Sequence, residues 1–161
     1  MPALISCLVV EDDPIQNFVL REQLKFMGYA SQGVENAHQA MELLERKSYA
    51  VALMDVRMPG MDGWQAAKAI RASHRPWRNM PIICVTAFAF SSDVEHAFAS
   101  GMDAYIAKPY SCETLRELIL AVLRESAEGI PPNCGGQAGI EYLAPLCCYQ
   151  RRIRQGTAIC F

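Results

Sequence analysis

Residues 51–63 read Val-Ala-Leu-Met-Asp-Val-Arg-Met-Pro-Gly-Met-Asp-Gly. The first four of them, Val51–Met54, are apolar, as in a parallel strand that is buried on both faces. Asp55 follows directly, and the residues after it have the composition of a turn, with Pro59 and Gly60 next to each other. In α/β proteins the carboxyl ends of parallel strands form the edge of the sheet where ligands bind. Asp55 is therefore the first candidate for a functional residue.

Strand and helix patterns alternate along the chain on both sides of this segment. The predicted strands are residues 4–10, 30–34, 50–55, 81–86 and 103–107. The expected helix caps are Asp13 with Pro14 behind it, Asn36, Ser92 with Glu95 as a capping box, and Ser111, and a further helix is expected at residues 63–72. This alternation predicts βαβ units with helices on both faces of a parallel sheet. The expected fold is α/β, a (βα)5 doubly wound, flavodoxin-like sheet with the strand order 2-1-3-4-5.

Length and composition limit the possible classes of protein. The chain has 161 residues, of which 52% are hydrophobic, and a net charge of −2. This suits one globular domain with a core of its own. No basic stripe is present that would indicate a nucleic-acid partner, and no apolar run reaches the roughly 20 residues of a membrane span. No secretory signal is visible, so we expect a cytoplasmic protein.

The last part of the chain differs in composition from the rest. We expect one domain at residues 1–126 and a linker-like C-terminal tail at residues 127–161, which is too short for an output domain with its own core. This tail could lack order, or pack on the first domain or on a partner. It holds four of the seven cysteines: Cys134, Cys147, Cys148 and Cys160. Their spacing fits no zinc pattern and the total is odd, so we expect reduced thiols.

Acidic residues also follow the first predicted strand. Glu11 and Asp12 come directly after it, and Asp55 is the last residue of the third. In the order 2-1-3-4-5 the first and third strands are neighbours, so these three carboxylates meet. Carboxylates packed together repel one another unless a cation lies between them. Mg²⁺ prefers such hard oxygen ligands, and the acids therefore predict a magnesium site.

Two more side chains end strands at the same edge. Thr86 ends the fourth predicted strand and Lys108 follows the fifth. A carboxylate such as Asp55 can attack a phosphoryl group, while a lysine ammonium and a hydroxyl neutralise and hold the phosphoryl oxygens. Each residue alone would be an ordinary turn or surface residue, and their joint occurrence favours phosphoryl chemistry.

With these motifs the chain resembles the receiver domain of bacterial response regulators and hybrid sensor kinases, over residues 3–125. Residues 9–14, Val-Val-Glu-Asp-Asp-Pro, match the acidic opening of that family, and residues 54–63 match its phosphoacceptor segment. Residues 85–87, Val-Thr-Ala, and the pair Lys108-Pro109 match the remaining switch and phosphate-binding positions.

The resemblance implies a role for each matching residue. Asp55 would be the phosphoacceptor, Lys108 would pair with the phosphoryl oxygens, and Thr86 would bind the phosphoryl group and move toward it. In the implied Mg²⁺ site Asp12 binds directly and Asp55 takes part, while Glu11 acts through water and Arg57 lends its backbone carbonyl. Tyr105 takes the switch-aromatic position, and the bond before Pro109 is cis in this family.

The implied function is that of a single-domain response regulator in a two-component system or phosphorelay. A phosphohistidine on a histidine kinase or histidine phosphotransfer protein would donate to Asp55, and the switched protein would bind a downstream target or pass the phosphoryl group on. Residues 86–90 and 100–104 resemble the receivers of hybrid kinases and phosphorelays. The chain would catalyse only its own phosphorylation and dephosphorylation.

Two other classes of function remain open from the sequence. One is a scaffold with the receiver fold that binds partners without phosphorylation. The other is a phosphatase that acts through an aspartyl phosphate. The complete set of acids, Thr86 and Lys108 disfavours the scaffold, and the length of the chain leaves no room for the cap domain of a phosphatase.

Overall fold

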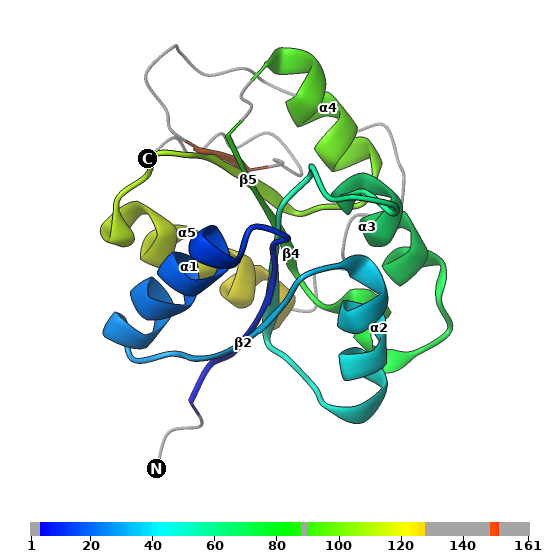
Figure 1. Cartoon of the computed structure of the whole chain (residues 1–161), viewed down its shortest axis with the longest axis horizontal. Helices are drawn as coiled ribbons and strands as arrows, with labels where there is room; N and C mark the ends of the chain where they lie inside the picture. Colours follow the sequence, from blue (N-terminus) through cyan, green and yellow to red (C-terminus); the bar gives the residue numbers. More distant parts are fainter. Residues whose placement is uncertain (1–3, 88–89, 128–148, 152–161) are drawn as a thin grey trace.

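The strands form a single sheet in the order β2-β1-β3-β4-β5-β6. The computed structural model describes residues 4–87, 90–127 and 149–151 (Figure 1). The strands are β1 (Ser6–Val10), β2 (Ala30–Val34), β3 (Val51–Met54), β4 (Ile82–Thr86), β5 (Ala104–Ala107) and β6 (Tyr149–Arg151). The first five are parallel, so the predicted fold class and the order 2-1-3-4-5 are confirmed. The sixth was not predicted; it belongs to the tail and pairs antiparallel with β5.

A helix follows each of the five parallel strands. They are α1 (Pro14–Phe26), α2 (Ala37–Arg46), α3 (Gly63–Ala72), α4 (Ser91–Ala99) and α5 (Cys112–Ala127). The segment before β4 contains a short 3₁₀ helix, η1 (Pro76–Asn79). Among the described residues no helix has both the length and the apolar character needed to cross a membrane.

Three of the predicted helix caps are confirmed. The Asp13 carboxylate accepts hydrogen bonds from the backbone N–H groups of Ile15 and Gln16, at 2.8 and 3.0 Å. Asn36 and Ser111 cap α2 and α5 in the same way through side-chain oxygens. Each cap satisfies an N–H group that the first turn of a helix leaves without a partner.

The predicted capping box of α4 is wrong. The helix begins at Ser91, so Ser92 lies inside its first turn and Phe90 occupies the N-cap position. Phe90 has an extended backbone, with φ −76° and ψ 148°, and its carbonyl accepts from the N–H groups of Asp93 and Val94. The chain therefore enters the helix two residues before the expected cap, without a side-chain cap.

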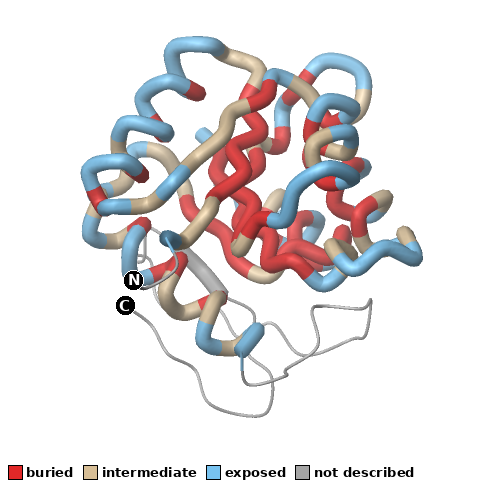
Figure 2. The backbone as a smooth tube through the Cα atoms, turned by 90° about the horizontal axis from the view of Figure 1, so that it is seen from below, coloured by how far each residue is buried: buried red, intermediate tan, exposed pale blue. Residues whose placement is uncertain are grey.

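Two apolar clusters fill the two faces of the sheet. Helices α2, α3 and α4 cover one face, and α1 and α5 cover the other (Figure 1). Neighbouring strand residues point to opposite faces, so Leu8 and Val10 join the first cluster while Cys7 and Val9 join the second. The central strands are buried along their length (Figure 2).

Helix α1 buries only part of its apolar surface. Leu20 and Leu24 of the helix, and Met27 at its C-cap, pack against the sheet. Other apolar side chains of this helix face solvent, and their exposed fractions are large: Ile15 73%, Phe18 61%, Val19 48% and Phe26 85%. We call these four residues the α1 apolar stripe.

A largely buried ion pair closes the amino ends of β4 and β5. Arg71 of α3 lies 2.7 Å from the carboxylate of Asp103, and both side chains are at most 15% exposed. The same guanidinium donates to the backbone carbonyl oxygens of Arg78, Met80 and Gly101. Arg71 therefore ties α3 to the segments that lead into both strands.

Candidate functional site

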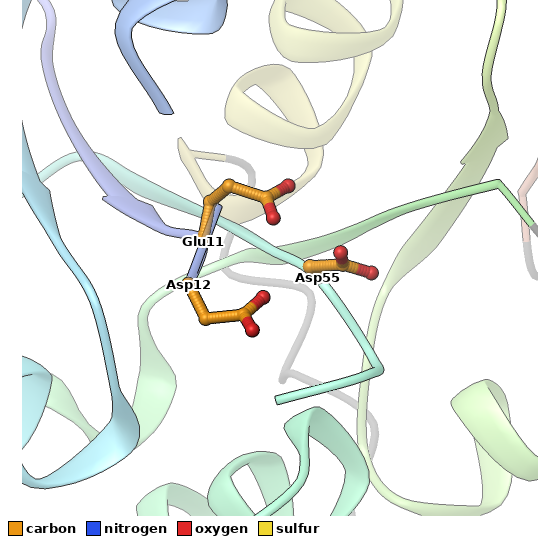
Figure 3. A group of neighbouring side chains, drawn as sticks. All are labelled: Glu11, Asp12 and Asp55. Atoms are coloured by element: carbon orange, nitrogen blue, oxygen red, sulfur yellow. The ribbon is translucent and has the colours of Figure 1, made fainter. Parts of the chain in front are cut away.

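Three carboxylates meet at the carboxyl ends of β1 and β3. The register pairs Val10 with Met54, so the residues that follow these strands become neighbours. Glu11, Asp12 and Asp55 each offer a carboxylate oxygen, and these oxygens lie within 4.8 Å of one another (Figure 3). Glu11 is buried, whereas Asp12 and Asp55 are partly exposed. Oxygen donors of this kind, open to solvent on one side, fit a Mg²⁺ ion that keeps several waters.

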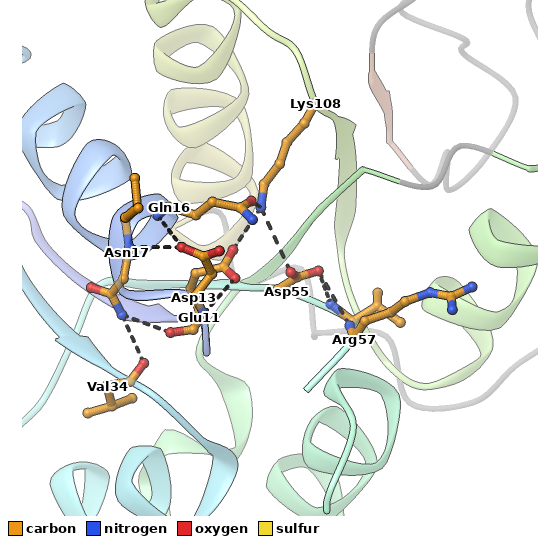
Figure 4. Close-up of polar contacts among 10 residues, drawn as sticks. Glu11, Asp13, Gln16, Asn17, Val34, Asp55, Arg57 and Lys108 are labelled. Carbon is orange, nitrogen blue, oxygen red and sulfur yellow. Dashed lines mark hydrogen bonds and ion pairs between the residues drawn. The ribbon is translucent and has the colours of Figure 1, made fainter. Parts of the chain in front are cut away.

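The backbone around Asp55 fixes the direction of its side chain. Its N–H donates to the carbonyl of Val10 at 2.9 Å, which holds Asp55 against β1. Oδ1 of Asp55 accepts from the N–H of Val56 at 2.6 Å and from that of Arg57 at 3.4 Å (Figure 4). The side chain of Arg57 is exposed. The carboxylate is thus oriented before any ligand arrives.

Gly63 allows the chain to pass close behind Asp55. Its N–H donates to the carbonyl of Val56 at 2.9 Å, where α3 begins. A Cβ atom at this position would overlap the backbone carbonyl oxygen of Asp55. The close approach therefore requires glycine.

Lys108 reaches the acids from the end of β5. Its Nζ atom lies 2.7 Å from Oε2 of Glu11 and 3.8 Å from Oδ2 of Asp55. It also donates to Oε1 of Gln16 (Figure 4). The peptide bond between Lys108 and Pro109 is cis. In the part of the chain that the structure describes, Lys108 is the only lysine paired with Glu11 or Asp55. Its ammonium group is thus shared between these two carboxylates and the side-chain amide of Gln16.

The surroundings of Glu11 and Asp13 shift their acidity in opposite directions. Burial raises the pKa of Glu11 above its usual range; the charge of Asp55 adds to this, while the hydrogen bond from Lys108 opposes it. Hydrogen bonds from the N–H groups of Gln16 and Ile15 lower the pKa of Asp13, which acts as a helix cap. Burial thus outweighs the pairing of Glu11 with Lys108, and a further cation beside the three acids would favour the ionised form of this carboxyl.

Thr86 and Tyr105 lie on the neighbouring strands and are both buried, with exposed fractions of 1% and 3%. The carbonyl of Thr86 accepts from the N–H of Lys108 at 2.8 Å, so the end of β4 is bonded directly to the segment that carries the lysine. Tyr105 is paired with Cys84 in the register of β4 and β5. Burial raises the pKa of the Tyr105 hydroxyl above its usual range.

Two residues of α1 contribute to the site that were not predicted. Gln16 contacts Lys108, as described above. Asn17 is buried and its Nδ2 donates to the carbonyl oxygens of Glu11 and Val34, at 3.0 Å each. The sequence could have indicated Gln16, because this residue lies in the first turn of a helix that begins next to Glu11 and Asp12.

The comparisons with known proteins agree with this geometry. Residues 7–120 match the family model of the response regulator receiver domain, and the chain belongs to this family. Its residues are 36% identical over 115 positions to the sensor protein GacS of Pseudomonas syringae pv. syringae, covering 70% of this chain and 13% of that protein. They are also 36% identical over 123 positions to the heme response regulator HssR of Staphylococcus aureus (strain Newman), covering 75% and 52%. The chain thus spans from about an eighth to half of the length of these relatives.

Solved structures with the same fold include the receiver domain of a sensor histidine kinase and that of a response regulator. The receiver domain of sensor histidine kinase PA1611 from Pseudomonas aeruginosa PAO1 superposes with a TM-score of 0.70 and 35% identity, covering 76% of this chain and 99% of that one. That structure holds a magnesium ion in the active site cleft. A CheY-like receiver domain from Methanospirillum hungatei JF-1 gives a TM-score of 0.71 and 28% identity, covering 79% and 99%. The chain is a receiver domain of two-component signalling.

Proposed function

We propose that this receiver accepts a phosphoryl group on Asp55 from a phosphohistidine and acts as a single-domain switch of a two-component system or phosphorelay. One observation carries the proposal: an oriented carboxylate lies beside two further acids and 3.8 Å from a lysine ammonium. This combination can bind a cation and a phosphoryl group at the same time. In this proposal residues 1–126 are the working domain, the protein is cytoplasmic, and it catalyses only its own phosphorylation and dephosphorylation.

Mg²⁺ is the proposed cofactor. Asp12 and Asp55 would bind it directly, Glu11 through water, and Arg57 through its backbone carbonyl. When bound, the ion supplies positive charge to the acids and to the oxygens of the incoming phosphoryl group. The convergence of three carboxylate oxygens within 4.8 Å supports this assignment.

The chemical step is a displacement at phosphorus. A carboxylate oxygen of Asp55 forms a bond to phosphorus while the phosphorus–nitrogen bond of the phosphohistidine breaks, and the imidazole keeps the electron pair and takes a proton. The backbone N–H groups of Val56 and Arg57 hold the nucleophile in place. Lys108 is close enough to turn toward the new phosphoryl oxygens and neutralise part of their charge. Hydrolysis by water later cleaves the bond between phosphorus and the Asp55 oxygen.

The switch would involve the strands next to the site. The hydroxyl of Thr86 is proposed to bind the phosphoryl group, and Tyr105 to change position with it. The hydrogen bond from Lys108 to the Thr86 carbonyl supports a concerted change, because it joins the two residues that would contact the phosphate. The new charge would shift the population toward a conformer that binds a downstream target protein or passes the phosphoryl group on.

The α1 apolar stripe supports docking of the phosphohistidine partner, a histidine kinase or histidine phosphotransfer protein. Helix α1 begins at Pro14, directly after the acids, so Ile15, Phe18 and Val19 lie on the surface next to the site. A contiguous set of exposed apolar side chains commonly marks a protein interface. A partner seated on it would have its phosphohistidine within reach of Asp55.

The test is intact-mass measurement of the full chain after incubation with acetyl phosphate, with and without Mg²⁺. We expect one phosphoryl increment that requires Mg²⁺ and is absent from Asp55→Asn. Asp62→Asn is the matched control, because Asn also caps a helix and Asp62 lies in the same segment. If the folded wild type gains no increment from acetyl phosphate or from phosphorylated kinases, the phosphoacceptor proposal fails.

A further inference from the structure

The outer edge of β5 is occupied by the tail of the chain. Without β6, β5 would be the last strand of the sheet and would leave a row of backbone N–H and C=O groups unpaired. Tyr149–Arg151 lies along it as an antiparallel strand (Figure 1). The register pairs Ala104 with Arg151, Tyr105 with Gln150, and Ile106 with Tyr149.

The direction of the backbone N–H groups of β5 shows which of them can form hydrogen bonds with β6. The N–H of Asp103 donates to the carbonyl of Ile82, on the β4 side. Successive residues of a strand direct their backbone groups to opposite sides. The N–H groups of Ala104 and Ile106 therefore point away from β4, toward β6, where Arg151 and Tyr149 are their register partners.

The length of the intervening chain allows this pairing within one molecule. Helix α5 runs back from the end of β5 and, with its 16 residues, is about 24 Å long. To begin β6 opposite Ile106, the chain has to return over a similar distance. The ~20 residues between Ala127 and Tyr149 can span up to roughly 70 Å when extended.

We propose that the β5 edge is a strand-docking site whose resident occupant is the chain's own segment Tyr149–Arg151, which shields the edge from pairing with a second copy. The segment itself suits an outermost strand, since it carries Arg151 and is followed by Arg152 and Arg154 in the sequence. Positive charge on an edge strand opposes further strand addition. The strand that carries Tyr105 is thus covered on both edges.

Hydrogen exchange measured by NMR on the full chain tests the docking. In Tyr149→Pro/Arg151→Pro both residues lose the N–H that can pair with β5. In the control Gln150→Pro the lost N–H is one that points away from β5, so it makes no hydrogen bond to this strand. We expect Ala104 and Ile106 to exchange at least about tenfold faster in the double variant than in the wild type or the control. The Tyr105 amide, which points toward β4, serves as internal reference and keeps its rate.

Two results would overturn the docking: fast exchange of Ala104 and Ile106 already in the wild type, or rates that are unchanged in the double variant. Measurements at several protein concentrations distinguish a strand from the same molecule from one supplied by a second copy. If the exchange rates of Ala104 and Ile106 stay constant on dilution and light scattering gives a monomeric mass, the strand docks within one molecule. Protection that falls with concentration means that a second copy supplies the strand, and the proposal is then wrong.

The shielding is tested by self-association of the same variants. With the edge uncovered, the double variant should form dimers or larger species at lower concentration than Gln150→Pro. If the double variant stays monomeric over the same range of concentrations as Gln150→Pro, the shielding proposal is wrong. None of these measurements depends on phosphorylation, so they can succeed or fail independently of the proposed function.

Discussion

The ammonium group of Lys108 is 2.7 Å from the carboxylate of Glu11, although 97 residues separate them in the chain. This ion pair joins the ends of β5 and β1 across β3 and β4. The same ammonium is 3.8 Å from Asp55, too far for a direct hydrogen bond. The lysine is thus held on the Glu11 side of the site, and it would have to shift to reach the phosphoryl group that we propose for Asp55.

Replacing Gln16 should make this shift easier. Gln16→Ala removes one of the acceptors that hold Lys108, and a hydrogen bond of this kind contributes about 0.5–1.5 kcal/mol. We therefore expect the aspartyl phosphate to form or persist about 2–10-fold better, measured as labelling and decay with acetyl phosphate. Gln39→Ala is the matched control, because Gln39 holds the same position after the cap of α2, away from the site. Equal kinetics in both variants would show that the Gln16 contact does not restrain the lysine.

A methyl group at Gly63 should impair the nucleophile. In Gly63→Ala the new Cβ overlaps the backbone carbonyl of Asp55, which cannot move aside as a flexible side chain could. We expect labelling of Asp55 to slow by about tenfold or more, because small displacements of a reacting group are costly. The control is Gly60→Ala in the same segment, where φ is +80° but no atom lies within 4 Å of the new Cβ. It should lose about 1 kcal/mol of stability and keep most of the labelling rate.

The Arg71–Asp103 pair should contribute far more to stability than an exposed pair. Arg71→Met removes the cation that pairs with Asp103 and that donates to three carbonyl oxygens, while the N–H of Ile82 still donates to Asp103, and we expect a loss of about 3–5 kcal/mol. Arg75→Met breaks the pair of Arg75 with Glu45, whose side chains are 61% and 43% exposed, and should cost less than about 1 kcal/mol. Urea unfolding of both variants checks the difference. Similar losses would mean that the buried network is not what holds the amino ends of β4 and β5.

Thiol labelling should report the burial of the central strand β1. Burial raises the pKa of Cys7 from an ordinary value of 9.0 to about 12, so at any pH below 9 its thiolate fraction is about a thousandfold smaller than in the unfolded chain. Raising the pH speeds alkylation in both states but keeps this gap. We expect Cys7 to be alkylated at least about a thousandfold slower in the native protein than in denaturant, followed by peptide mass spectrometry. Cys112, which is partly exposed, is the internal control; equal native rates for the two would contradict the burial.

The α1 apolar stripe should affect phosphoryl transfer from phosphohistidine proteins but not phosphorylation by the small molecule acetyl phosphate. Phe18→Ser is expected to lower phosphoryl transfer from any phosphohistidine protein that labels the wild type, while labelling by acetyl phosphate stays unchanged. A truncated interface anchor typically costs about 1–2 kcal/mol, or about 5–30-fold. Phe26→Ser, two helical turns farther from the site and 85% exposed, is the control. If Phe18→Ser slows both routes alike, the residue acts on the site and not on docking.

The strand order and the meeting of the acids could be predicted because each depends on strong local patterns. Continuous apolar runs such as Val51–Met54 are typical of buried parallel strands, and the topology then brings Glu11 and Asp55 to one edge. The helix at Gly63–Ala72 was likewise predicted with its observed bounds. For these features the local pattern and the tertiary fold agree.

Other features depend on how elements pack, which periodicity does not show. In α1 apolar residues recur on two faces, and the sequence alone does not tell that Leu20 and Leu24 are buried while Phe18 is exposed. The contact of Gln16 with Lys108 depends on the position of α1 relative to β5. With three residues, β6 is too short for a detectable period, so it could be found only from its pairing with β5.

The segment between α3 and β4 lies at the end of the sheet opposite the acids, where Arg71 closes the amino ends of the strands. Exposed loop positions of this kind tolerate insertions best. His74 and Arg75 are both exposed, and the hydrogen bonds described above for Arg71 go to Arg78, Met80, Gly101 and Asp103 rather than to either of them. A fluorescent or affinity module could therefore be inserted between them, at the end of the sheet away from Asp55, so that it would leave the edge with the three acids open.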